Sequence, residues 1–180
     1  MQSIHLLQTT LEENASAKSF LFSLQDFYSI FPDMTIDNLR MLFSRAAKKG
    51  LLERICKGIY LYPKVEYDSS IVLYKVASKL RSSCFNYISL ETVLCEASVI
   101  SQQLMGWITI ITTGRSGIIN CGRFGTIEFV HTQKKVEHIS QELTLDTRYG
   151  MLRASVKQAL IDMKDAKRPF DLVNMENPNE

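Results

Sequence analysis

The sequence is poor in the residues that mark several specialised protein classes. It has four cysteines in 180 residues, and none of them forms a CxxC pair or the Cys/His spacing of a zinc site. No apolar run reaches the roughly 18 residues of a membrane helix, and the N-terminus lacks a signal segment. We therefore expect a cytoplasmic protein with reduced thiols, no disulfide framework and no membrane contact.

The chain also lacks a strong excess of charge. Lys and Arg total 21 and Asp and Glu total 19, so the net charge is +2. This is too little to coat nucleic acid non-specifically, and any such role must depend on local clustering. The apolar fraction of 46% and the charged fraction of 22% are typical of a globular protein, and the length suggests one or two domains.

Common catalytic patterns are missing as well. The three histidines form no HExxH, and Ser116 lies in GRSGI rather than in the GxSxG of a hydrolase. The acids Asp162 and Asp165 are expected to be surface charges of a helix. Because no nucleophile is grouped with a base and an orienting residue, we expect no enzyme activity, no metal site and no cofactor.

Charge does cluster in residues 35–64, which hold seven Lys and Arg against two acids, a net charge of +5. Thr35 is a good N-cap and Gly50 a good helix C-cap, so a helix is predicted between them. At 100° per residue the helix has one apolar side and one polar, basic side. The polar side is formed by Asn38, Met41, Ser44, Arg45 and Lys48, with Arg40 and Lys49 on its flanks.

After Gly50 the pattern changes to that of a hairpin. LLERICKGIYLYP has β-branched and aromatic residues on both sides of a Cys56-Lys57-Gly58 turn, and Pro63 ends the second strand. A basic-faced helix followed by a basic hairpin is the order of a winged helix-turn-helix. The alternative is a solvated helix face beside a small hairpin, but the segregation of charge argues against it. The predicted DNA-binding residues are Asn38, Arg40, Met41, Ser44, Arg45, Lys48, Lys49, Arg54 and Lys57.

The polar stretch 64–69 suggests two domains in an α+β protein. Residues 1–66 would form the winged helix-turn-helix, and residues 67–180 a small α+β domain with an antiparallel sheet. In the first domain we expect helices at 3–13 and 24–31 and a short strand at 19–22. In the second we expect helices at 70–81, 90–99 and 151–167, and strands at 107–113 and 126–131.

The segment GRSGIINCGRFG suggests a phosphate-binding loop only weakly. It lacks the GxxxxGK[ST] spacing and lies between strands, so hairpin turns explain its glycines. Charged residues in this segment and after it are candidates for a surface that faces a protein partner or RNA, although they could also be solvated loops. They are Arg115, Arg123, Lys134, Lys135 and Arg148.

Three stretches resemble the AbiEi family, the antitoxins of type IV toxin–antitoxin systems. The stretch from Lys48 to Pro63, KKGLLERICKGIYLYP, is similar to that family's wing. Residues 87–94, YISLETVL, resemble a helix start in its second domain, and residues 154–162, ASVKQALID, a later helix. The chain departs from the family at Val156-Lys157, where Pro-Glu is usual, and at Thr92-Val93.

The resemblance implies a two-part antitoxin. The winged helix would bind the double-stranded DNA of its own operator, and the second domain would neutralise a cognate nucleotidyltransferase-like toxin, with or without direct contact. One alternative is a winged-helix regulator whose second domain dimerises or binds an effector. Another is an enzyme that acts on nucleotides through the glycine-rich hairpin.

Overall fold

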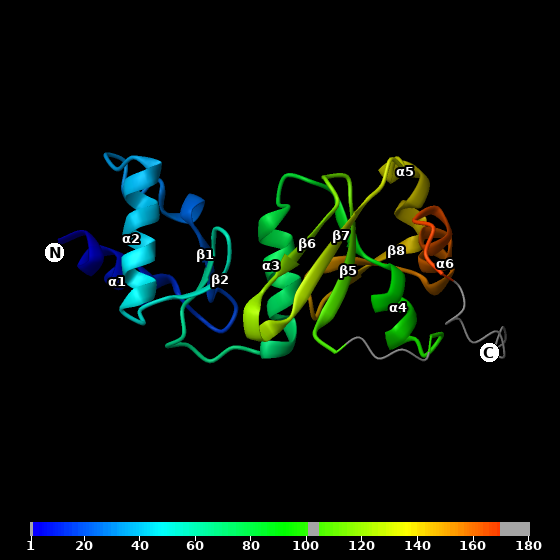
Figure 1. Ribbon diagram of the computed structural model, residues 1–180, viewed down its shortest axis with the longest axis horizontal. Helices are drawn as coiled ribbons and strands as arrows, with labels where there is room; N and C mark the ends of the chain where they lie inside the picture. Colours follow the sequence, from blue (N-terminus) through cyan, green and yellow to red (C-terminus); the bar gives the residue numbers. More distant parts are fainter. Residues whose placement is uncertain (1, 101–104, 170–180) are drawn as a thin grey trace. The chain divides into compact units, whose positions relative to one another are not determined.

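The computed structural model describes residues 2–100 and 105–169. The chain is an α+β protein that divides into two compact units, Met1–Ser70 and Ile71–Glu180, called here the N-terminal and C-terminal units (Figure 1). Within the described ranges no helix combines the length and the apolarity needed to cross a membrane.

The N-terminal unit combines helices with a small antiparallel sheet. Its strands lie in the order β1-β3-β2, and β3 pairs antiparallel with both neighbours. The Lys57-Gly58 turn joins β2 to β3; it lies within the predicted Cys56-Lys57-Gly58 turn, of which Cys56 belongs to β2. The elements are α1 (Gln2–Asn14), β1 (Leu21–Ser23), the 3-10 helix η1 (Leu24–Phe27), α2 (Ile36–Lys48), β2 (Glu53–Cys56) and β3 (Ile59–Leu61).

Aromatic rings form the centre of this unit's core. The ring of Phe43 on α2 packs edge-to-face against Phe27 and Tyr60, with centroids 5.1 Å away in each case. Leu7 and Leu11 of α1 are fully buried in the same cluster. Fully burying such a side chain contributes about 1.5–3 kcal/mol, so this core fixes α2 against the sheet.

The helix expected at residues 24–31 is wrong beyond its first turn. Only Leu24–Phe27 forms a short 3-10 helix, and turns follow up to Met34. Pro32 restricts the backbone of Phe31, and both Phe27 and Phe31 are buried as core anchors. The segment is too short for a regular helix to develop between these constraints.

The C-terminal unit is built on a six-stranded sheet with the order β6-β7-β5-β4-β9-β8. Figure 1 shows α3 on one side of β5, and α4 and α6 on the other. The strands are β4 (Asn86–Ile88), β5 (Trp107–Thr112), β6 (Gly117–Asn120), β7 (Thr126–His131), β8 (Leu143–Asp146) and β9 (Met151–Ala154). The helices are η2 (Ser69–Ile71, at the unit boundary), α3 (Val72–Leu80), α4 (Leu90–Glu96), η3 (Gly122–Phe124), α5 (Val136–Ile139), η4 (Ser140–Glu142) and α6 (Val156–Asp165).

The predicted antiparallel sheet is wrong, because this sheet is mixed. Strand β7 lies between β5 and β6 and runs parallel to β5, and β9 runs parallel to β4. The start of β7 can lie beside the start of β5 only because Gly125, which precedes β7, packs closely against Gly106, which precedes β5. A Cβ on Gly125, which has φ +114°, would lie 1.9 Å from the carbonyl oxygen of Gly106. Only glycine allows the two strands to start this close together.

The helix expected at 151–167 is also partly wrong. Met151–Ala154 forms strand β9, and helix α6 starts only at Val156. The side chain of Ser155 accepts a hydrogen bond from the backbone N–H of Gln158 at 3.1 Å, which is an N-cap interaction. The apolar residues before Ser155 belong to the sheet because this cap begins the helix after them.

Candidate nucleic-acid interface

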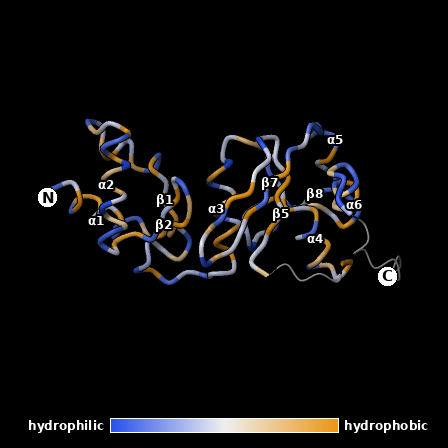
Figure 2. The backbone as a smooth tube through the Cα atoms, in the orientation of Figure 1, coloured by the Kyte–Doolittle hydropathy of each residue, from blue (hydrophilic) through white to orange (hydrophobic). Residues whose placement is uncertain are grey.

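Helix α2 presents two chemically different faces, and Figure 2 shows hydrophobic and hydrophilic residues alternating along it. Thr35 begins the helix, because its Oγ1 accepts a hydrogen bond from the N–H of Asn38 at 3.3 Å. Gly50 follows the helix with φ +73°, a conformation that favours glycine. The buried face consists of Leu39, Leu42, Phe43 and Ala46.

The opposite face of α2 is exposed and basic. Arg45 and Lys48 lie in the last turn, where a positive charge also favours the helix dipole. Arg40 is ion-paired with Asp37 at 2.7 Å on the surface, so its charge is partly offset. All seven predicted residues of this helix are exposed: Asn38, Arg40, Met41, Ser44, Arg45, Lys48 and Lys49.

The hairpin that follows α2 carries the other two predicted residues. Lys57 is exposed at the turn between β2 and β3, beside Gly58 with φ +84°. Arg54 is exposed on β2, and its Nε donates to the carbonyl oxygen of Cys56 at 3.4 Å. All nine predicted DNA-binding residues are therefore accessible, and all lie in the N-terminal unit.

The five candidate residues of the C-terminal unit come from separate connections. Arg115 and Arg123 flank β6, Lys134 and Lys135 follow β7, and Arg148 lies in the turn between β8 and β9. Four of them are exposed, but Lys134 is only 24% exposed. Its ammonium group bonds to Asp162 and Asp165, at 2.8 and 2.7 Å.

Asp162 is buried, so its expected place on the helix surface is wrong. Each carboxylate oxygen accepts two hydrogen bonds. Oδ1 accepts from Lys134 Nζ at 2.8 Å and Gln158 Nε2 at 2.7 Å. Oδ2 accepts from Tyr87 Oη at 3.0 Å and Ser89 Oγ at 2.7 Å. The carboxylate thus joins β4, α6 and the segment after β7, and we name these five residues the Asp162 cluster.

The cluster shifts the pKa of two of its members. Burial, together with the charge of Asp162, raises the pKa of Tyr87 well above its ordinary value. Burial alone would lower the pKa of Lys134, but its hydrogen bonds to Asp162 and Asp165 raise it above the ordinary value. Around neutral pH Lys134 is therefore positively charged and Tyr87 is a neutral hydrogen-bond donor.

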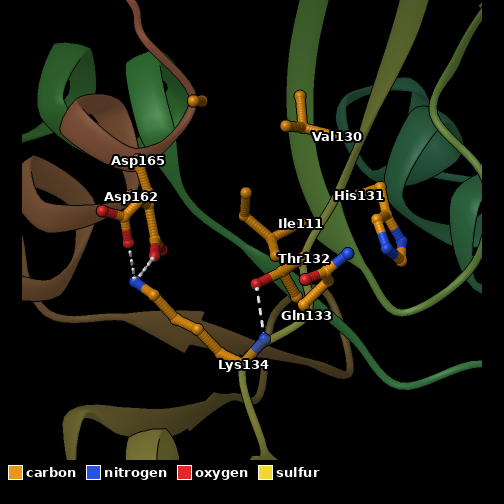
Figure 3. Close-up of a pocket in the computed structure, with 9 residues that line it drawn as sticks. Ile111, Val130, His131, Thr132, Gln133, Lys134, Asp162 and Asp165 are labelled. Atoms are coloured by element: carbon orange, nitrogen blue, oxygen red, sulfur yellow. Dashed lines mark hydrogen bonds and ion pairs between the residues drawn. The ribbon is translucent and has the colours of Figure 1, made fainter.

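A pocket of about 310 Å³ opens beside the cluster (Figure 3). Lys134 extends toward Asp162 and Asp165 on one side, and His131 lies on the other. The His131 Nδ1 is 2.8 Å from the carbonyl oxygen of Gly114. The lining residues are Ile111, Val130, His131, Thr132, Gln133, Lys134, Asp162, Asp165 and Ala166. The pocket mixes polar and apolar groups and could hold a small polar molecule.

One sequence signal could have revealed the cluster. Asp162 lies between Ala159 and Met163, so it falls on the buried stripe of α6 rather than on its solvent side. Among the described residues no three His, Cys, Asp or Glu side chains are grouped so as to hold a metal ion.

Comparison with known proteins adds no family assignment. No family model matches the sequence, and the search of curated proteins finds no match either.

Proposed function

We propose that the N-terminal unit is a winged helix-turn-helix that binds double-stranded DNA. One observation carries this proposal: the exposed face of α2 is basic, while its other face is buried against the aromatic core. In such a domain α2 is the recognition helix in the major groove, and the β2–β3 hairpin is the wing beside it. Lys and Arg at phosphates supply affinity through counterion release.

We further propose that the protein is an antitoxin and autorepressor similar to the AbiEi family. In this proposal the N-terminal unit binds the operator of its own gene, and the C-terminal unit neutralises a nucleotidyltransferase-like toxin. The Asp162 cluster supports the similarity, because it joins two stretches on which the resemblance depends. Tyr87 and Ser89 come from the stretch 87–94, and Asp162 ends the stretch 154–162.

Arg45→Ala tests the DNA-binding proposal. Full-length protein should bind DNA from upstream of its own gene more tightly than scrambled DNA in a gel shift. Arg45→Ala should weaken operator binding by about 1–3 kcal/mol and reduce the preference for the operator, because arginine can bond two acceptors of one guanine. Lys18→Ala, an exposed lysine outside residues 35–64, is the control and should bind like the parent. Equal operator affinity for Arg45→Ala and the parent would contradict the role of Arg45.

A second candidate function is favoured by the pocket beside the Asp162 cluster. In that case the protein is a winged-helix regulator whose C-terminal unit binds a small polar effector. Growth assays with the neighbouring toxin gene separate the two proposals. Rescue of growth supports the antitoxin, whereas normal DNA binding without rescue supports the regulator.

A further inference from the structure

Met41 is an apolar side chain in the middle of a polar face. It is 61% exposed, whereas the other apolar residues of α2's central turns, Leu39, Leu42 and Phe43, are buried. Its neighbours on the exposed face are Asn38, Ser44, Arg45 and Lys48. Exposing a large apolar group here gives no benefit to the folded unit, because burial of that group is what would stabilise it.

The spacing of the exposed face suits successive base pairs. Asn38, Met41 and Arg45 lie three and four residues apart, on the same side of α2 over two turns. At about 1.5 Å per residue these steps are about 4.5 and 6 Å along the helix axis. Base pairs are stacked about 3.4 Å apart, so the three side chains can address different base pairs within one short half-site.

Chemistry then restricts what Met41 can recognise. Its thioether is only a weak acceptor and offers mainly apolar surface. In the major groove the thymine C5-methyl is the apolar group, whereas the other base edges present hydrogen-bond donors and acceptors. Asparagine pairs with adenine and arginine with guanine, so the neighbours of Met41 are suited to different bases.

We propose that Met41 selects a thymine of the operator by contact with its C5-methyl group. This inference rests on the proposed DNA-binding function and adds a base preference to it. The recognised half-site then contains a thymine between the positions that Asn38 and Arg45 contact. The basic residues around Met41 favour this occupant, because they complement DNA phosphates.

Replacement of thymidine by deoxyuridine provides the test, because deoxyuridine lacks only the C5-methyl group. Footprinting of the full-length protein on its upstream DNA first defines the protected half-sites. Each thymine there is then replaced singly by deoxyuridine, and affinity is measured by fluorescence anisotropy at fixed salt. At one position the parent should lose about fourfold in affinity, which corresponds to the transfer of one methyl group. Met41→Ala should bind the thymine and deoxyuridine sites equally.

Two controls make the result specific to the apolar contact. Met41→Leu keeps apolar surface and should keep the deoxyuridine penalty, and Lys18→Ala, an exposed lysine outside residues 35–64, should also keep it. The inference is overturned if no thymine is sensitive, or if Met41→Ala shows the parent's penalty. It is also overturned if light scattering shows that Met41→Ala disrupts an oligomer, since Met41 would then contact protein. If the parent protects no upstream DNA, the proposed function itself fails.

Discussion

The hydroxyl of Ser89 donates a hydrogen bond to Oδ2 of Asp162 over 2.7 Å, although the two residues are 73 positions apart in the chain. Ser89 is the N-cap residue of α4, yet its side chain bonds to α6 rather than to its own helix. The backbone at this junction is constrained as well, since the buried Leu90 has φ +57°. The contact therefore fixes the start of α4 against α6.

Asp162→Asn should destabilise the C-terminal unit by about 2–4 kcal/mol, because breaking a buried charged pair leaves its partners unsatisfied. Four donors point at the carboxylate, and the asparagine amide offers only one acceptor oxygen. Urea unfolding can be followed by the fluorescence of Trp107 on β5, the protein's single tryptophan.

Asp165→Asn is the matched control for that substitution. It removes the same charge from the neighbourhood of Lys134, but Asp165 is 54% exposed. Exposed ion pairs contribute up to about 1 kcal/mol, so the loss should stay within that range. Equal losses for the two variants would show that burial of Asp162 is unimportant for stability.

Gly125→Ala should destabilise the sheet by more than about 2 kcal/mol, because positive φ and a backbone clash act together. The added methyl would meet the carbonyl oxygen of Gly106 at 1.9 Å, and a backbone atom cannot move aside cheaply. Gly117→Ala on β6 has nothing within 4 Å of the new methyl and should change stability by about 0.5 kcal/mol at most. The same urea experiment measures both, and a Gly125→Ala protein as stable as the parent would contradict the close strand approach.

Lys57→Ala should weaken binding to all DNA sequences to the same degree, if the hairpin tip contacts a phosphate. The slope of log affinity against log salt should become shallower by about 0.9, the value for one lost phosphate contact. Anisotropy titrations between low and moderate salt measure this slope. Lys164→Ala, on the exposed side of α6, should leave the slope unchanged. A parent-like slope for Lys57→Ala would show that the tip does not touch DNA.

If the protein is the antitoxin proposed above, neutralisation of the toxin should be separable from DNA binding. Full-length Arg45→Ala should lose repression of a promoter reporter and still rescue cells that express the neighbouring toxin. Residues 71–180 should give at least partial rescue, and residues 1–70 should bind operator without rescue, because the basic face lies wholly in the N-terminal unit. Circular dichroism of each fragment controls for folding. Rescue by residues 1–70, with none from a folded 71–180 fragment, would reverse this division of labour.

The sequence predicted α2 and the β2–β3 hairpin well, because their signals are local. Thr35, Gly50 and the Lys57-Gly58 turn each determine a boundary within a few residues of themselves. The exposure of the nine candidate DNA-binding residues followed from the same helical and hairpin periods. The helix predicted at 24–31 does not form beyond its first turn, because core contacts hold Phe27 and Phe31. Local helix propensity takes no account of such contacts.

In the C-terminal unit the wrong predictions concern strands and side chains whose contact partners lie far away in the sequence. The strand patterns at 107–113 and 126–131 do not predict that β7 lies beside β5 and parallel to it. Side chains alternate between the two faces of a strand in the same way in parallel and antiparallel pairs. Asp162 looked like a surface charge because its four donors come from positions 87, 89, 134 and 158. Its place on the apolar stripe of α6 was the one local sign of burial.

The position of β9 beside β4 has a consequence for synthesis on the ribosome. The pairings of the β1-β3-β2 sheet all lie between Leu21 and Leu61, so that sheet can close early in translation. Strand β4 receives its second neighbour only when Met151–Ala154 has emerged, and Asp162 emerges later still. A transcript cut short before Met151 would thus encode the basic helix without a completed C-terminal sheet. Under the function proposed above, such a product would bind the operator without neutralising a toxin.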